Sequence, residues 1–231
     1  MRAVGNYLKR WGFTPQKPIK RAYERRPEAV KAWLDEQYPI IEKQAQAEGG
    51  EVHWGDEIAL VNTDATARTG RSYAPRGQTP VTMAVGGTRQ KLSMISTVTN
   101  QGKSSWMIIE DAFNAETLIE FLEALVSDGQ SRKKKVLLIL DKLRVHHSKL
   151  VNAWLADKKD KIEVFYLPRH GPELNPDEQL NADLKHAIGS KVPARTKAKL
   201  KAATTANIQM LEQHPDRVRS YFGDPRVAYA A

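Results

Sequence analysis

The sequence of 231 residues is 41% apolar, which is long and apolar enough to bury the core of one domain with at most a small appendage. The absence of cysteine excludes disulfides, cysteine zinc sites and thiol nucleophiles, and it fits a reducing cytoplasm. The 36 Lys and Arg residues against 27 Asp and Glu residues give a net charge of +9, which favours a nucleic acid as partner.

Membrane and nucleotide-cofactor functions find no support in the sequence. The longest aliphatic run, residues 136–140, is far shorter than the roughly 18 residues of a membrane span, and the first residues lack the apolar core of a signal peptide. Neither GxxxxGK[ST] nor GxGxxG occurs, so we expect no nucleotide cofactor. We expect a soluble, cytoplasmic, nucleoid-associated protein without membrane contact.

The N-terminal region combines one short helix with a basic linker. Val4, Tyr7, Leu8 and Trp11 recur at helical spacing, and Gly12 predicts the end of that helix. Residues 1–26 contain eight basic residues and one acidic residue, and residues 185–201 contain six basic residues and no acid. Such runs are either solvated surfaces or phosphate contacts. Residues 27–50 then predict a connecting helix that is interrupted at Pro39.

Residues 51–190 alternate between strand and helix patterns and predict an α/β domain with a mixed sheet. Residues 51–62, 91–100 and 104–113 predict three strands, the last two joined by a hairpin at residues 101–103. A helix capped by Asn114, a central strand at 136–140, a helix at 148–159, a strand at 162–168 and a helix from Asn175 follow. Residues 191–231 predict a C-terminal tail that is helical over 196–213.

Three acidic residues lie where such a layout can gather them. Asp56 lies in the first strand, Asp141 ends the central strand, and Glu178 opens the helix after the last strand. They converge only if the first and fourth strands are neighbours. Three carboxylates would suit Mg²⁺ or Mn²⁺, and two such ions support phosphoryl transfer on a polynucleotide.

Each acid also has a purely structural interpretation. Asp56 fits an edge charge, Asp141 a solvated strand end, and Glu178 the closing residue of a capping box that Asn175 begins. A histidine-carboxylate metal set is a further alternative. It would use His53 with Asp56, or His146 and His147 with Asp141, but no HExxH-type spacing occurs.

The ordered motifs WGDE, RTGRSYAPRGQTP, LSMISTVTNQG, ILDKLRVHHSK and YLPRHGPELNPDEQLNADLK resemble the catalytic domain of bacterial insertion-sequence transposases of the 630 family, relatives of the eukaryotic mariner elements. The resemblance runs over about residues 5–188. It implies an RNase H-like (retroviral integrase-like) fold and a catalytic, metal-binding DDE triad of Asp56, Asp141 and Glu178 with two Mg²⁺ or Mn²⁺ ions. It also implies a homodimer that cleaves transposon terminal inverted repeats and transfers the strands into target DNA.

We expect seven further residues to contact DNA, namely Arg68, Arg71, Arg76, Lys142, Arg144, His146 and Lys185.

The sequence departs from the family pattern at three places. Lys142 stands where the family has Asn, and it is expected either to lower the pKa of Asp141 and compete with a metal or to point away and bind phosphate. His170 and Gly171 replace Tyr-Ser. Residues 1–26 resemble only the end of the family's helix-turn-helix region. Two alternatives therefore stay open: an RNase H-like nuclease without strand transfer, or a catalytically inactive DNA-binding remnant that regulates transposition.

Overall fold

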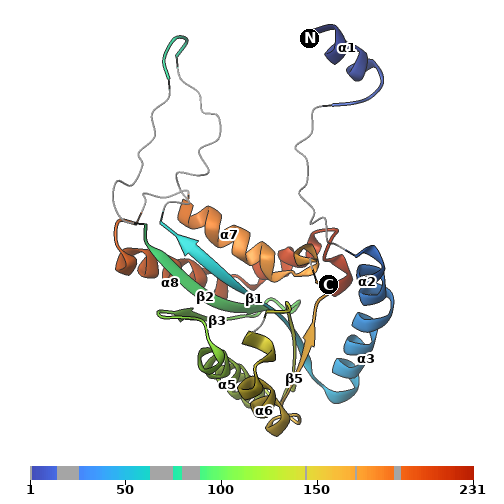
Figure 1. Ribbon diagram of the computed structural model, residues 1–231, viewed down its shortest axis with the longest axis vertical. Helices are drawn as coiled ribbons and strands as arrows, with labels where there is room; N and C mark the ends of the chain where they lie inside the picture. Colours follow the sequence, from blue (N-terminus) through green and yellow to red (C-terminus); the bar gives the residue numbers. More distant parts are fainter. Residues whose placement is uncertain are drawn as a thin grey trace.

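A mixed five-stranded sheet forms the centre of the protein (Figure 1). The computed structural model describes residues 2–14, 26–62, 75–79, 89–143, 145–169, 171–189 and 194–231. The strands are β1 (Glu51–Val61), β2 (Lys91–Val98), β3 (Ser104–Ile109), β4 (Val136–Leu140) and β5 (Ile162–Tyr166), in the spatial order β3-β2-β1-β4-β5. β1, β2 and β3 are antiparallel neighbours, whereas β4 lies parallel to both β1 and β5. The prediction that the first and fourth strands are neighbours is confirmed.

β4 is buried on both faces because helices cover both sides of the sheet. Leu137 and Ile139 contact the core on one face, whereas Val136, Leu138 and Leu140 contact the core on the other. All five side chains are at most 2% exposed, as expected for a central strand whose side chains alternate between two cores.

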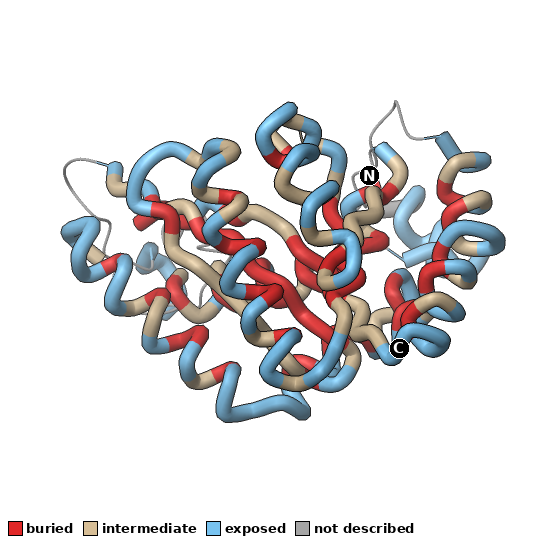
Figure 2. Tube along the Cα trace, turned by 90° about the horizontal axis from the view of Figure 1, so that it is seen from below, coloured by how far each residue is buried: buried red, intermediate tan, exposed pale blue. Residues whose placement is uncertain are grey.

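Helices pack on the two faces in separate layers (Figures 1 and 2). α5 (Ala115–Ser131) and α6 (Lys149–Asp157) cover one face, and the side chain of Asn114 caps α5 by accepting from the Thr117 N–H, as predicted. α7 (Asp177–Gly189) and α8 (Lys197–Glu212) cover the other, followed by α9 (Pro215–Ser220). Short helical turns are η2 (Val145–His147), η3 (Pro172–Leu174), η4 (Tyr221–Gly223) and η5 (Ala228–Ala230).

The chain before the sheet contains the expected helices. α1 (Arg2–Arg10) ends before Gly12, which has a positive φ of 79°, and the apolar side chains of Val4 and Trp11 are exposed. The predicted linker around Pro15 and Pro18 lies outside the described residues. Among the helices that the structure describes, none is long and apolar enough to cross a membrane.

The interruption predicted at Pro39 takes the form of a π turn rather than a break. α2 (Pro27–Ala32) continues through η1 (Trp33–Gln37) into α3 (Tyr38–Glu48). The N–H of Tyr38 donates to the carbonyl of Trp33, five residues back, so the wider turn accommodates the missing N–H of Pro39. Trp33 is buried, and its Nε1 donates to the hydroxyl of Tyr229 at 3.2 Å, which ties this helix to the C-terminal segment.

The beginning of β1 carries a partly buried ion-pair group. The Glu51 carboxylate lies 3.0 Å from His53 Nε2 and accepts from Arg132 Nη1 at 2.5 Å. Burial alone would raise the pKa of Glu51, but the hydrogen bonds and charges of His53 and Arg132 outweigh it and lower the pKa to about 2.

The predicted hairpin at residues 101–103 joins β2 and β3, and its glycine is held against α9. Gly102 has φ +87° and donates its N–H to the carbonyl of Thr99 at 3.0 Å. A Cβ added to Gly102 would stand 2.5 Å from the carbonyl oxygen of Pro215. Glycine is therefore required both by the backbone conformation and by the close approach.

Candidate active site

The register of the sheet brings Asp56 and Asp141 side by side. Trp54 pairs with Ile139 in the parallel β1–β4 ladder, and two residues further along each strand lie Asp56 and Asp141. Because side chains alternate, Asp56 faces the same side as Trp54, and Asp141 the same side as Ile139. Both Trp54 and Ile139 contact the core beneath α7, so the two carboxylates point to the face that α7 covers.

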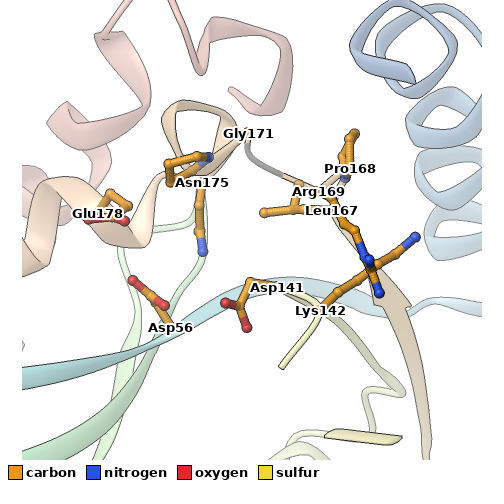
Figure 3. A pocket seen from close by; sticks show the side chains of 10 residues that line it. Asp56, Asp141, Lys142, Leu167, Pro168, Arg169, Gly171, Asn175 and Glu178 are labelled. Carbon is orange, nitrogen blue, oxygen red and sulfur yellow. The ribbon is translucent and has the colours of Figure 1, made fainter. Parts of the chain in front are cut away.

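The beginning of α7 is tied to this edge of the sheet by two hydrogen bonds. Asn175 Nδ2 donates to the backbone carbonyl of Gly55 at 2.9 Å, and Ser96 Oγ donates to Asp177 Oδ2 at 2.8 Å. Asn175 Oδ1 also accepts from the N–H of Asp177, which caps the helix. These contacts place Glu178 opposite the two aspartates (Figure 3).

The capping-box interpretation of Glu178 is not what the structure shows. In a capping box the carboxylate would accept from the backbone N–H of Asn175. That N–H donates instead to the carbonyl of Pro172 at 2.9 Å. The carboxylate of Glu178 lines the pocket that also contains Asp56 and Asp141.

This acidic pocket has a volume of about 390 Å³. It is lined by Asp56, Asp141, Lys142, Leu167, Pro168, Arg169, Gly171, Pro172, Asn175 and Glu178. Gly55 allows the strands to meet here, because a Cβ on it would stand 2.9 Å from Leu140 Cδ2 and 3.1 Å from the carbonyl oxygen of Ser96.

All three acids have raised pKa values, and burial is the main cause for each. Burial, together with the charges of Glu178 and Asp141, raises the pKa of Asp56 to about 7. Hydrogen bonds from the Glu57 N–H at 2.8 Å and Asn181 Nδ2 at 2.9 Å act in the opposite direction. Burial also raises the pKa of Asp141 and of Glu178. Such a cluster favours a cation or protons between the carboxylates.

Comparison with known protein families identifies this domain. Residues 51–201, more than half of the chain, match the family model described as DDE superfamily endonuclease. The chain belongs to the DDE superfamily endonucleases. Residues 1–37 of this DDE endonuclease match a model described as winged helix-turn-helix. A comparison with curated protein sequences finds no match.

Solved structures similar to this DDE endonuclease include several of the Mos1 transposase. The Mos1 mariner paired-end complex with Mn has a TM-score of 0.66 and 17% identity, over 100% of this chain and 71% of that chain. The Mos1 strand transfer complex has a TM-score of 0.60 and 19% identity, over 96% and 70%. The catalytic domain of Mos1 has a TM-score of 0.53 and 16% identity, over 94% and 97%. The likeness confirms the predicted RNase H-like fold.

Of the two alternatives for Lys142, the structure contradicts the first, in which it lowers the pKa of Asp141, and agrees with the second in that the side chain points away from the acids. The expected lowering of the Asp141 pKa is wrong: burial raises it, and the opposing influences come from His146 and from the backbone N–H of Leu143. In Figure 3 the side chain of Lys142 extends away from Asp56 and Glu178, toward Arg169. The cation is therefore placed beside the acidic pocket and not between its carboxylates.

His146 is 3% exposed, so the prediction that it contacts DNA is corrected. Its Nδ1 lies 2.8 Å from the backbone carbonyl of Asp141 and 3.4 Å from Asp141 Oδ1. Because a carbonyl can only accept, Nδ1 carries the proton and donates. His146 therefore holds the backbone of Asp141 in place through this hydrogen bond.

The histidine-carboxylate alternative is not formed in this arrangement. His53 is buried, with its ring nitrogens near Glu51 and Thr97, on the side of β1 away from Asp56. His147 packs against the ring of Tyr166 at a centroid separation of 4.3 Å.

The remaining DNA-binding predictions divide into two groups. Arg76 is exposed, and Lys185 is half-buried on α7, where its charge partly offsets the rise that burial causes in the pKa of Glu178. Arg68, Arg71 and Arg144 lie outside the described residues, as does His170.

Sequence reasoning missed the residues that position the acids. Asn181 donates to Asp56, and Asp177 is fully buried beside the site, with its pKa raised well above the usual value by burial. The helical spacing of Glu178 and Asn181, three residues apart, was a usable signal, because such residues share a face. Arg169 lines the pocket and was also missed.

The donor set fits a hard divalent cation in its chemistry. Asp141 Oδ1 is buried without a hydrogen-bond partner, and the carboxylates around it have raised pKa values. Among the described residues, no three His, Asp or Glu side chains are close enough together to hold one ion as they stand. Metal binding therefore requires the side chains to draw together.

Proposed function

We propose that this protein is a DDE transposase of the 630 family that cleaves DNA at transposon ends and transfers the cut strands into target DNA. The observation that carries the proposal is the convergence of Asp56, Asp141 and Glu178, from three separate elements, in one pocket of the DDE domain. Similar solved structures include a Mos1 paired-end complex with the left transposon end and a Mos1 strand transfer complex. The protein would act as a homodimer, because joining transposon ends requires two active sites.

The residues of the pocket have distinct parts in this reaction. Asp56, Asp141 and Glu178 would hold two Mg²⁺ or Mn²⁺ ions, and similar Mos1 paired-end complexes contain Mg or Mn. When bound, such ions activate water or a 3′-hydroxyl and stabilise the departing oxygen. Asn181 holds Asp56 by its Oδ2, and His146 fixes the backbone of Asp141, so both residues are held at the pocket before substrate arrives.

The experiment that tests the function is cleavage and strand transfer with duplexes made from the DNA that flanks the gene. Wild type would be compared with Asp56→Asn, Asp141→Asn and Glu178→Gln in Mg²⁺ or Mn²⁺. The matched control is Asp160→Asn, an exposed aspartate in the turn before β5. We expect each triad variant to lose cleavage and the control to retain it. Cleavage that survives all three changes would contradict the assignment.

The same experiment separates the alternatives. Hydrolysis without joined products indicates an RNase H-like nuclease. Absence of cleavage together with calorimetric absence of divalent-ion binding indicates an inactive DNA-binding remnant.

A further inference from the structure

A second cavity, of about 450 Å³, lies beside the acidic pocket at the ends of β4 and β5. We call it the basic pocket, and it is lined by Arg26, Ala29, Gln37, Lys142, Tyr166, Pro168 and Arg169. Lys142, Pro168 and Arg169 also line the acidic pocket, so the two cavities share a wall. In Figure 3 the cationic ends of Lys142 and Arg169 lie on the side away from Asp56 and Glu178.

The walls of the basic pocket are held by the protein itself. Val30 and Trp33 are buried in the main core, which fixes α2 and η1 and with them the positions of Arg26 and Gln37. On the other side, the Tyr166 hydroxyl donates to the backbone carbonyl of His146 at 3.1 Å. The cavity therefore does not need a ligand to form.

The lining of the basic pocket is positively charged. Arg26, Lys142 and Arg169 contribute three cations, and no lining residue is acidic. Within the described parts of the chain, no carboxylate forms an ion pair with any of the three. By contrast, Arg132 and Arg217 are paired with acids. Three cations around one cavity repel one another, and a bound anion would remove that repulsion.

We propose that the basic pocket binds one nucleotide of the DNA strand that passes through the acidic pocket, with its phosphate held by Arg169, Lys142 and Arg26. This rests on the proposed function. The volume suits a single nucleotide and not a duplex. The amide of Gln37 offers a donor and an acceptor to a base edge, and the ring of Tyr166 offers an aromatic surface. The pocket thus positions the strand whose neighbouring phosphodiester faces the three acids.

The test is binding of a short thymidine oligonucleotide, measured by fluorescence anisotropy in EDTA over a range of salt concentrations. The variants are Arg26→Gln, Lys142→Gln and Arg169→Gln. Lys159→Gln is the matched control, because Lys159 is an exposed cation in the turn before β5, at the opposite end of that strand. Arg26 lines the basic pocket but not the acidic pocket, so the Arg26→Gln variant tests the basic pocket alone.

We expect each pocket variant to bind the oligonucleotide roughly ten-fold more weakly, as for loss of one charge-assisted hydrogen bond. The slope of log affinity against log salt should fall by about 0.7 for each phosphate that the variant no longer neutralises, and Lys159→Gln should change both quantities little. Equal affinity in the three pocket variants and the control overturns the proposal. The proposal is also overturned if the pocket variants lose the same affinity for a hairpin duplex with the same number of phosphates as they lose for the single strand.

Failure here is distinguishable from failure of the proposed function. The binding measurement requires neither divalent ions nor cleavage. The Asp141→Asn variant should lose cleavage, but its affinity for the oligonucleotide should still fall when Arg26 or Arg169 is replaced, as it does in wild type. Thermal unfolding of every variant checks that it is folded, and Arg26 and Arg169 are exposed, so their replacement should leave the core intact.

Discussion

Replacing Asp56 by Asn should stabilise the metal-free protein at alkaline pH. The pKa of Asp56 is raised from 3.8 to about 7, so between these values the native state binds more protons than the unfolded state. The free energy of unfolding therefore falls as the pH rises through this window. The gap between the two pKa values corresponds to about 4 kcal/mol at most, since each pKa unit is worth about 1.4 kcal/mol.

The neutral amide of Asn has nearly the same shape as the carboxyl group and does not ionise. Asp56→Asn should thus exceed wild type in stability by up to about 4 kcal/mol at about pH 8, and the difference should vanish below about pH 4. Urea denaturation in EDTA at several pH values measures this difference. Asp160→Asn should follow wild type throughout, because its side chain is exposed. Saturating Mg²⁺ should stabilise wild type and leave Asp56→Asn nearly unchanged, which reverses the order.

A stability difference between Asp56→Asn and wild type that is the same at every pH would refute this expectation. In that case the Asp56 carboxylate would not be destabilised by burial or by its neighbours Asp141 and Glu178.

Three further substitutions test residues that support the sheet and the backbone of the site. Glu51→Gln should lower the free energy of unfolding by about 3 kcal/mol at neutral pH, and this loss should shrink as the pH falls below 4.5 toward 2, where the wild-type carboxylate protonates as well. Gly102→Ala should destabilise by at least about 1 kcal/mol in urea denaturation, whereas Gly223→Ala, with open space at its Cβ, should be near neutral. His146→Ala should weaken Mn²⁺ binding, measured by calorimetry, by about ten-fold or more, because the backbone of Asp141 loses its hydrogen bond from His146. An unchanged affinity would show that this hydrogen bond is dispensable.

The order of the elements and the central strand could be predicted from local patterns. Residues 136–140 are apolar at every position, and only a strand covered on both faces buries all of them, as the structure confirms. The same residues also explain why a carboxylate follows immediately. The chain leaves the covered part of the sheet at Leu140, and Asp141 is the first side chain that reaches the pocket.

The side-chain contacts of the site could not be predicted, because they depend on register and on long-range packing. Asp56 lies beside Asp141 because Trp54 pairs with Ile139, and no local sequence pattern specifies this register. The direction of Lys142 and the burial of His146 likewise depend on how the turn after β4 packs. The sequence alone therefore did not decide which way Lys142 points, and it did not show that His146 is buried.

The segment 175–178 shows how helix capping and active-site chemistry use the same residues. Asn175 caps α7 through its Oδ1 and, through its Nδ2, joins the helix to the carbonyl beside Asp56. Asp177 adds a second tie through Ser96, although this buries another carboxyl group near Asp56 and Glu178. Repulsion within such a cluster would push α7 away from the sheet, and these two hydrogen bonds oppose it. The metal-free protein thus holds its acids around one pocket against their mutual repulsion, which is the condition under which a divalent cation would contribute both stability and reactivity.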